Sequence, residues 1–320
     1  DRVPAGGWSV DVLSPAGARP AGADPNPWSL VARAHADGLT ALLTGDAESD
    51  ALSRLPLAPV DVLKVSHHGS EDPGAGPLLA RLRPRVAVIS SGAGNPFGHP
   101  RAPTLQALAE AGAATWRTDT AGDVTVTDVG GDGFPLALHR LEPLELPSSP
   151  RELLVEMGAW TAYFDCGLHG TDPIGPVSVM CQFARCRGMA IRVIPDTGLR
   201  LGAVSWELFA DHPTSFLNYE RSITLVNQGT RWVFETYGMP LPFEDLERYK
   251  RRRARDRFDS AMAEAYSRAV GVDAFDRDAY GPRAILVTHT GGAPPLMRMA
   301  LADVQARFGI QPGRAGHLPG

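Results

Sequence analysis

Three short segments of the sequence carry side chains that bind divalent metal ions in proteins. "LLTGDAE" supplies Asp46, "LKVSHHGS" supplies His67 and His68, and "AGNPFGHP" supplies His99. Neutral imidazoles and carboxylates are ligands of zinc, and a carboxylate can bridge two ions that share a hydroxide. The three segments therefore predict a site that can bind a divalent metal ion, with Asp46, His67 and His68 as its candidate ligands.

Each segment also has an ordinary structural explanation when it is taken alone. A Gly-Asp pair after a strand is often a helix N-cap, and a single histidine such as His99 is often only a loop residue. The adjacent histidines are harder to explain by packing, although neighbours on a strand point to opposite faces. His67 and His68 can share one site only if the backbone turns between them; otherwise one is a ligand and the other supports it or faces the substrate.

Strand-like and helical segments alternate up to about residue 130, which predicts an α/β unit over residues 1–130. Strands are expected at 8–15, 60–66 and 85–92. In α/β folds, ligands bind beyond the carboxyl ends of the strands. Because the metal-competent segments follow strand ends, we expect them to converge in space.

The rest of the sequence predicts a second domain. Residues 131–156 are rich in glycine, proline and serine, and we expect a linker there. Residues 157–290 contain several strand-like runs and a helical run from Phe243 to Gly271, which together predict an α+β domain. Residues 291–320 contain glycine and proline, and we expect a flexible tail.

The composition narrows the classes of function. A net charge of −5 gives no general attraction to nucleic acid, so any anion binding must come from a local patch. Three cysteines are too few and too scattered to indicate a disulfide framework. The sequence contains no apolar run of about 18–20 residues and its first residues do not form a signal peptide, so it predicts no membrane span and leaves the localisation open.

One local basic patch occurs in the second domain, in "RYKRRRARDR". On a helix, steps of three and four residues place Arg248, Arg251, Arg252 and Arg255 on one face. Guanidinium groups on such a face can bind phosphate. Several acidic residues lie nearby in the sequence, however, and they favour the interpretation of a solvated face with little net attraction.

The residues of the motifs in the first domain, and the order of these motifs, resemble those of a known family. "NPWSLVARAHADGLTALLTGDAE", "VDVLKVSHHGS" and "RPRVAVISSGAGNPFGHPRAPTLQALAEAGAATWRTDTAGDVTV" are similar to the C-terminal half of the metallo-β-lactamase-like domain in ComEC/Rec2 competence proteins. The resemblance covers roughly residues 7–128. It implies a partial metallo-β-lactamase-like fold, the αββα half, followed by a separate α+β domain.

The same resemblance implies an activity and a set of site residues. Proteins of this family are implicated in DNA uptake, and the domain is thought to be a nuclease on DNA that uses a divalent metal, zinc or manganese. Asp46 matches the bridging carboxylate, and His67 and His68 match the later histidine motif. The resemblance therefore implies that these three residues are the metal ligands and catalytic residues. The residues expected to line the substrate-facing loops are Ser70, Asn95, His99, Thr118 and Asp119.

One departure from the family pattern is large. The main metal-binding signature, His-x-His-x-Asp-His, does not occur in these 320 residues. We therefore expect a truncated half of a metal-dependent hydrolase that is inactive alone. Its expected partners are DNA and the missing N-terminal half or the membrane channel of the family. The expected location is the extracytoplasmic face of the membrane if the chain belongs to a full-length ComEC-like protein, and otherwise the cytoplasm.

Two alternatives remain open from the sequence. The chain can be a non-enzymatic adaptor or interaction protein in which the first domain is a degenerate hydrolase scaffold. It can also be a read-through fusion of two neighbouring proteins, since Met157 stands where a second protein could start. Residues 157–290 loosely resemble an uncharacterised group of actinobacterial proteins, and this resemblance implies no known activity.

Overall fold

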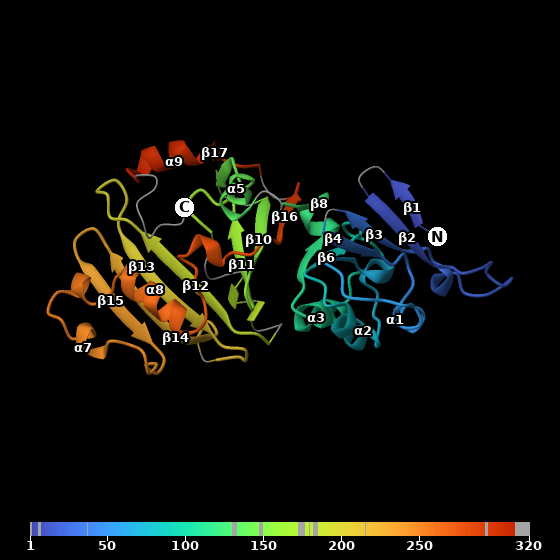
Figure 1. Ribbon diagram of the computed structural model, residues 1–320, viewed down its shortest axis with the longest axis horizontal. Helices are drawn as coiled ribbons and strands as arrows, with labels where there is room; N and C mark the ends of the chain where they lie inside the picture. The colour runs from blue at the N-terminus through green and yellow to red at the C-terminus, as the bar shows by residue number, and fades with distance from the viewer. Residues whose placement is uncertain are drawn as a thin grey trace. The chain divides into compact units, whose positions relative to one another are not determined.

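The computed structural model of the chain forms two compact units (Figure 1). Unit 1 contains the described residues up to Asp128, and unit 2 contains most of those from Val129 onwards. The structure describes residues 2–5, 8–36, 38–129, 133–146, 150–171, 177–178, 180–181, 185–214, 216–291 and 294–310.

Unit 1 is built on a seven-stranded sheet whose strands follow one another in chain order. They are β1 (Arg2–Ala5), β2 (Trp8–Ser14), β3 (Val31–Ala36), β4 (Leu39–Leu43), β5 (Val62–Lys64), β6 (Val86–Ile89) and β7 (Ala114–Arg117). The first four strands pair antiparallel, whereas β4, β5, β6 and β7 are parallel neighbours. Because parallel strands end at the same edge of a sheet, the loops after β4, β5, β6 and β7 lie at one edge.

Three helices of unit 1 lie together along one side of this sheet in Figure 1. They are α1 (Ser49–Leu52), α2 (Ala75–Leu82) and α3 (Ala102–Glu110). Leu52, Leu79 and Leu108 of these helices are buried against the strands in one apolar cluster. Each fully buried leucine stabilises the fold by about 1.5–3 kcal/mol, so the cluster fixes the sheet edge from which the loops extend.

Unit 2 contains an antiparallel meander and a second sheet. The meander consists of β12 (Gly188–Ile194), β13 (Ala203–Phe209), β14 (Tyr219–Asn227) and β15 (Trp232–Tyr237). In the other sheet, β10 (Arg151–Met157) lies between β11 (Trp160–Asp165) and β16 (Ala284–His289). A short antiparallel pair, β9 (Leu144–Leu146) with β17 (Met297–Met299), is also present.

Helix α8 (Ser260–Ala269) covers one face of the meander. Its residues Met262 and Tyr266 pack against the fully buried Trp206 of β13. The Trp206 indole donates a hydrogen bond to the Ser267 hydroxyl at 3.1 Å, which satisfies a buried donor. In the part of the chain that the structure describes, no helix is both long and apolar enough to cross a membrane.

The structure differs from the linker that the sequence predicts at 131–156. The described part of this segment contains α5 (Phe134–His139), β9 and most of β10. Leu153 and Val155 of β10 are fully buried, and β10 is paired on both sides. Burial of these apolar side chains outweighs the high local content of glycine and proline. Residues 130–132 and 147–149 lie outside the described residues.

The predicted flexible tail, 291–320, also contains regular structure. Strand β17 and α9 (Leu301–Phe308) lie in this segment, and Val304 of α9 is buried. The amphipathic pattern of "LADVQARF" is the signal that the prediction overlooked. Residues 311–320, the last part of the predicted tail, fall outside the described residues.

The helix predicted from Phe243 to Gly271 is divided into three short elements. These are α7 (Leu246–Tyr249), the 3-10 turn η4 (Ala254–Asp256) and α8. The Asp245 and Asp259 carboxylates each accept a backbone N–H at the start of a separate helix. A single helix would also stack the like charges of Arg248, Arg251, Arg252 and Arg255, so the four arginines do not share one helix face.

The free thiols of unit 2 give a test of local electrostatics. Cys181 is buried and Cys186 is exposed. Their mutual hydrogen bond lowers the pKa of the Cys186 thiol to about 7 and raises the pKa of Cys181, which burial raises further. We expect iodoacetamide to label Cys186 with a rate that reaches half its maximum near pH 7, because the thiolate is the nucleophile.

The measurement is peptide mass spectrometry of labelled protein over a range of pH. The buried Cys166, whose pKa is raised by burial, serves as the internal control and should stay unlabelled while the protein is folded. In Cys181→Ala the midpoint for Cys186 should move to higher pH. A midpoint that is the same in both proteins would show that the thiols do not interact.

Candidate metal-binding site

The predicted metal-competent residues lie together at the edge where β4, β5 and β6 end. Asp46 follows β4, and His67 and His68 lie in the short turn η2 (Ser66–Gly69) after β5. His99 lies in the loop after β6. The ring centroids of His67 and His68 are 6.4 Å apart, and those of His67 and His99 are 5.7 Å apart.

The backbone turns sharply at the paired histidines. His67 has φ 44° and ψ 45°, and His68 has φ 55° and ψ 22°. This left-handed conformation costs roughly 1–2 kcal/mol for each residue with a side chain. It also removes the alternation of a strand, so both imidazoles lie on the same side of the loop as Asp46 and Glu48. Strain of this kind is found in sites where the surrounding structure holds a functional arrangement.

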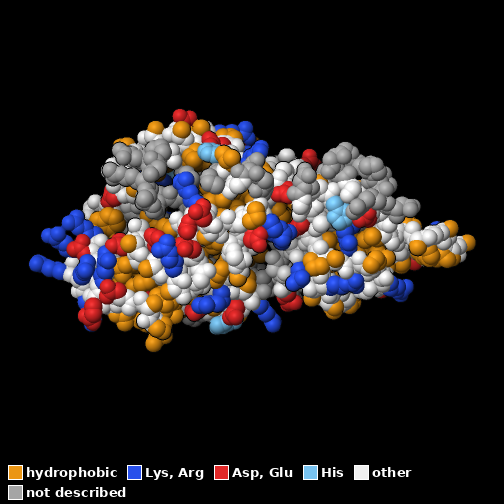
Figure 2. Space-filling view, viewed as in Figure 1, with side chains coloured by type: hydrophobic (Ala, Val, Ile, Leu, Met, Phe, Trp, Pro, Cys, Tyr) orange, Lys and Arg blue, Asp and Glu red, His pale blue; other side chains and the backbone are white. Residues whose placement is uncertain are grey.

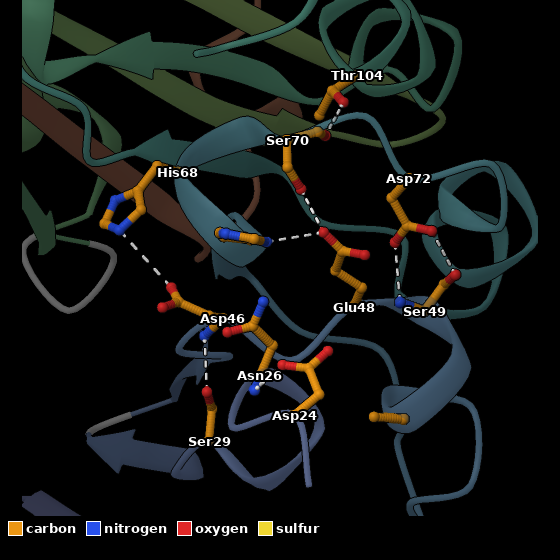
Figure 3. A network of polar contacts seen from close by, with 12 residues as sticks. Asp24, Asn26, Ser29, Asp46, Glu48, Ser49, His68, Ser70, Asp72 and Thr104 are labelled. Carbon is orange, nitrogen blue, oxygen red and sulfur yellow. Dashed lines mark hydrogen bonds and ion pairs between the residues drawn. The ribbon is translucent and has the colours of Figure 1, made fainter. Parts of the chain in front are cut away.

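His68 and Asp46 face each other across the site (Figure 3). His68 Nε2 is 3.6 Å from Asp46 Oδ1, and both side chains are partly exposed. His68 Nδ1 donates a hydrogen bond to the Ser90 carbonyl at 2.6 Å. A histidine whose Nδ1 is bonded to a carbonyl keeps a free lone pair on Nε2, which is the arrangement found in most metal-bound histidines.

His67 binds a carboxylate that the sequence did not indicate. Its Nδ1 donates to Glu48 Oε1 at 2.9 Å, and the Ser70 hydroxyl donates to the same oxygen at 2.5 Å. Ser70 therefore supports Glu48 (Figure 3), and its role toward a substrate stays a prediction. The hydroxyl of Thr104 in turn donates to the Ser70 carbonyl.

Glu48 is free for this role because another residue caps α1. Glu48 occupies the N-cap position but makes no side-chain cap. The Asp72 carboxylate instead accepts the Ser49 backbone N–H at 2.8 Å and the Ser49 hydroxyl at 2.5 Å. In sequence, Glu48 reads as an ordinary acidic residue at a helix start, and only the fold brings Asp72 to the helix.

Lys64 is a second residue of the site that sequence reasoning missed. Its ammonium group donates to the Gly45 carbonyl at 3.0 Å. Burial lowers the pKa of Lys64, and the nearby negative charge of Asp46 acts in the opposite direction. The positive charge of Lys64 therefore lies beside Asp46 at the same edge of the sheet.

The loop that carries His99 is braced by Asn95. The Asn95 amide donates to the His99 carbonyl at 2.6 Å, and its oxygen accepts the His99 backbone N–H at 3.1 Å. The pKa of His99 is lowered, first by burial and then by the positive charges of His67, Arg101 and His68. The negative charge of Glu48 opposes this shift only in part. A lowered pKa keeps this imidazole neutral, as a metal ligand must be.

The last two predicted loop residues have structural partners. The Thr118 hydroxyl donates to the Ser91 carbonyl at 2.8 Å and accepts the Ser91 N–H at 2.9 Å. Asp119 forms a bidentate pair with Arg117, which lowers the pKa of the Asp119 carboxyl. In the structure, Asn95, Thr118 and Asp119 tie loops together, and their role toward a substrate stays a prediction.

Among the described residues, the arrangement brings no group of three or more histidine, cysteine, aspartate or glutamate side chains to one point where they could hold an ion. Asp46 and His68 form one pair of donors, and Glu48 and His67 form another. A structural zinc site needs four ligands and a catalytic site needs three from protein. Each of these pairs has fewer donors than either kind of zinc site requires.

Two curated proteins are similar to part of the chain. ComE operon protein 3 of Bacillus subtilis is 36% identical over 117 residues, which are 35% of this chain and 15% of that protein. Recombination protein 2 of Haemophilus influenzae is 40% identical over 87 residues, which are 27% of this chain and 11% of that protein. No family model and no solved structure matches. The matched region is thus a small part of the length of either relative.

Proposed function

We propose that unit 1 is part of a ComEC/Rec2-type, metal-dependent hydrolase of nucleic-acid phosphodiesters, with a partial metallo-β-lactamase-like fold, and that the chain has a role related to competence. The similarity to ComE operon protein 3 and Recombination protein 2 supports the lineage. The observation that supports metal-dependent hydrolysis is the Asp46–His68 pair. In this pair the Ser90 carbonyl accepts the His68 Nδ1–H and so fixes the imidazole tautomer.

The spacing of this pair fits a shared ion. A tetrahedral zinc with nitrogen at about 2.0–2.1 Å and oxygen at about 2.0–2.2 Å places these two atoms about 3.4 Å apart. The observed separation of 3.6 Å between His68 Nε2 and Asp46 Oδ1 is close to this value and longer than a good hydrogen bond. Zinc and manganese both accept imidazole and carboxylate ligands.

The residues of unit 1 have separate tasks in this proposal. Asp46 and His68 hold a divalent ion, and Glu48 orients His67 toward the same edge of the sheet. A divalent ion supplies, when bound, an acidified water and a positive charge beside the phosphate. The remaining ligands would come from another polypeptide segment that carries the His-x-His-x-Asp-His signature. In this proposal the 320-residue chain by itself is inactive.

We expect Mn²⁺ titration to broaden the imidazole NMR signals of His68 first. His67 and His99 should broaden next, because their rings lie within one cluster. Asp46→Asn should raise the Mn²⁺ concentration needed to broaden His68 at least tenfold, and His68→Gln should do the same for His67 and His99. The reason is that loss of even a supporting residue typically lowers metal affinity by roughly 10- to 100-fold.

The matched control is His139→Gln in unit 2. His139 is an exposed histidine that also pairs with a carboxylate, Glu142 at 3.1 Å, so it tests whether any His–carboxylate pair gives the same result. Its replacement should leave the broadening of His68 unchanged. Equal broadening of His139 and His68 in the original chain would refute a specific site in unit 1.

A non-enzymatic adaptor is the second candidate function. The observation that favours it is the lack, among the described residues, of a third donor beside Asp46 and His68. Addition of a polypeptide bearing the His-x-His-x-Asp-His signature separates the two proposals. Phosphodiester hydrolysis that depends on both His68 and the added polypeptide supports the hydrolase, and a stable complex without hydrolysis supports the adaptor.

A further inference from the structure

Residues 250–257, which we call the arginine loop, connect α7 to α8 and carry an unusual density of positive charge. The sequence "KRRRARDR" contains six basic residues and one acidic residue. Arg251, Arg252, Arg253 and Arg255 are all exposed. Figure 2 shows Lys and Arg side chains gathered on the part of unit 2 where Figure 1 places α7 and β15.

The loop is held in place by two other arginines. Arg248 donates through Nε to the Asp256 carbonyl at 3.2 Å, and its guanidinium also pairs with the Asp259 carboxylate. Arg257 donates to the Arg251 carbonyl at 2.8 Å, and its guanidinium lies 5.8 Å from the centre of the Phe234 ring. These contacts fix the backbone of the loop against the meander, so its exposed arginines extend from a defined surface.

The acidic residues nearby are mostly committed to other partners. Glu244 is buried against Arg221, Glu247 pairs with Lys250, and Asp245 and Asp259 cap helices. Asp256 approaches Arg255 only at 3.8 Å. The sequence favoured a face neutralised by these acids. In the described part of the chain, none of these acids pairs with Arg251, Arg252 or Arg253.

Three adjacent guanidinium groups have no acidic partner in the part of the chain that the structure describes. Among the described residues, Arg251 donates only to the Asp256 carbonyl, at 3.4 Å, and the side chains of Arg252 and Arg253 make no polar contact. An uncompensated cluster of charge repels itself, and it is a site where a polyanion can displace counterions. Arg248, by contrast, is already engaged and is not available for an anion.

We propose that the arginine loop binds the phosphodiester backbone of nucleic acid through Arg251, Arg252 and Arg253. A duplex presents one negative charge per ~1.7 Å of its axis, so several guanidinium groups of one loop can meet phosphates together. The fork of donors on each guanidinium matches phosphate oxygens in bidentate fashion. The proposal concerns unit 2 and does not rest on the metal site of unit 1.

Two features of the loop favour nucleic acid over other anionic partners. A membrane-surface segment places apolar side chains beside its basic residues, and the single apolar residue of the loop, Ala254, packs against the core of the meander. The loop itself also has no aromatic residue on which an unpaired base could stack. We therefore expect binding to follow charge density, with duplex DNA bound more tightly than a single strand of the same length.

The test is fluorescence anisotropy of the full chain with a short labelled DNA duplex, in EDTA so that no metal contributes. Three phosphate contacts predict that log K falls with log salt with a slope of about −2.7. The triple variant Arg251→Gln/Arg252→Gln/Arg253→Gln should lose most of this slope and at least tenfold in affinity at low salt. Failure of the metal proposal would leave this result unchanged.

The control variant is Arg54→Gln/Arg83→Gln/Arg231→Gln. It removes three arginines that are likewise exposed and that have no acidic partner among the described residues, so the net charge of the chain changes by the same amount. This variant should bind like the original protein. Equal losses in both variants, no salt-dependent binding by the original chain, or binding to anionic vesicles or polyglutamate but not to DNA would each overturn the proposal.

Discussion

Replacement of Arg221 by methionine is expected to destabilise the meander of unit 2 by about 3–5 kcal/mol. Arg221 and Glu244 form a bidentate ion pair, with N–O distances of 2.8 and 2.5 Å, and their side chains are 2% and 0% exposed. Arg221 also donates to the carbonyls of Tyr237 and Gly238. Loss of the guanidinium leaves the Glu244 carboxylate buried and unpaired, which is the physical reason for the large cost.

The measurement is hydrogen exchange of the β14 amides, which reports the free energy of opening for this sheet alone. The neighbouring residue provides the control, because Glu220 pairs with Arg187 at 2.9 Å on the exposed side of the strand. Glu220→Gln should cost less than about 1 kcal/mol. The double variant Arg221→Met/Glu244→Leu should recover most of the loss, since no unpaired charge then remains. Similar effects of Arg221→Met and Glu220→Gln would contradict the explanation.

Replacement of Gly69 by alanine should disrupt the edge of unit 1 that carries the paired histidines. Gly69 has φ +80°, and an added Cβ would lie 2.6 Å from Pro100 Cβ and 3.1 Å from Pro100 Cα. Pro100 cannot move away freely, because Arg101 donates its backbone N–H to the Gly69 carbonyl at 2.8 Å. Left-handed strain and overpacking together predict a loss of about 2–5 kcal/mol.

Hydrogen exchange of amides in β5 and β6 measures this loss, and Mn²⁺ broadening of His68 measures its effect on the site. Both should change in Gly69→Ala. The control is Gly76→Ala in α2, where an added Cβ meets nothing within 4 Å. That variant should leave the site intact and stabilise α2 by up to about 1 kcal/mol, because alanine is the better helix former. An unchanged β5 in Gly69→Ala would show that the loop can adapt.

Part of the site could be predicted from the sequence because it depends on local order. Asp46, His67, His68 and His99 each follow a strand, and strands paired in parallel deliver their following loops to one edge of the sheet. The convergence of these residues therefore needed only the positions of the strands. The assignment of the fold to a metallo-β-lactamase-like class stays a prediction, as does the substrate.

The secondary structure of unit 2 was harder to predict from the sequence. The sequence predicted a linker where β10 lies and one long helix where α7, η4 and α8 lie. The glycine and proline content of the first segment favoured a linker. In the structure, β10 forms a buried strand because it is paired with β11 on one side and β16 on the other. In the second, the Asp259 carboxylate caps the start of α8 by accepting a backbone N–H and also pairs with Arg248.

The sequence by itself determined which residues can ligate a metal, at which strand ends they occur, and that residues 250–257 are strongly basic. Only the tertiary structure decided that Glu48 joins the site, that Ser90 fixes the His68 tautomer, and which arginines remain unpaired. The physical reason is that strand ends are specified by neighbouring residues. Hydrogen-bond partners such as Asp72 and Ser49, or Arg221 and Glu244, are 23 residues apart and meet only when the chain has folded.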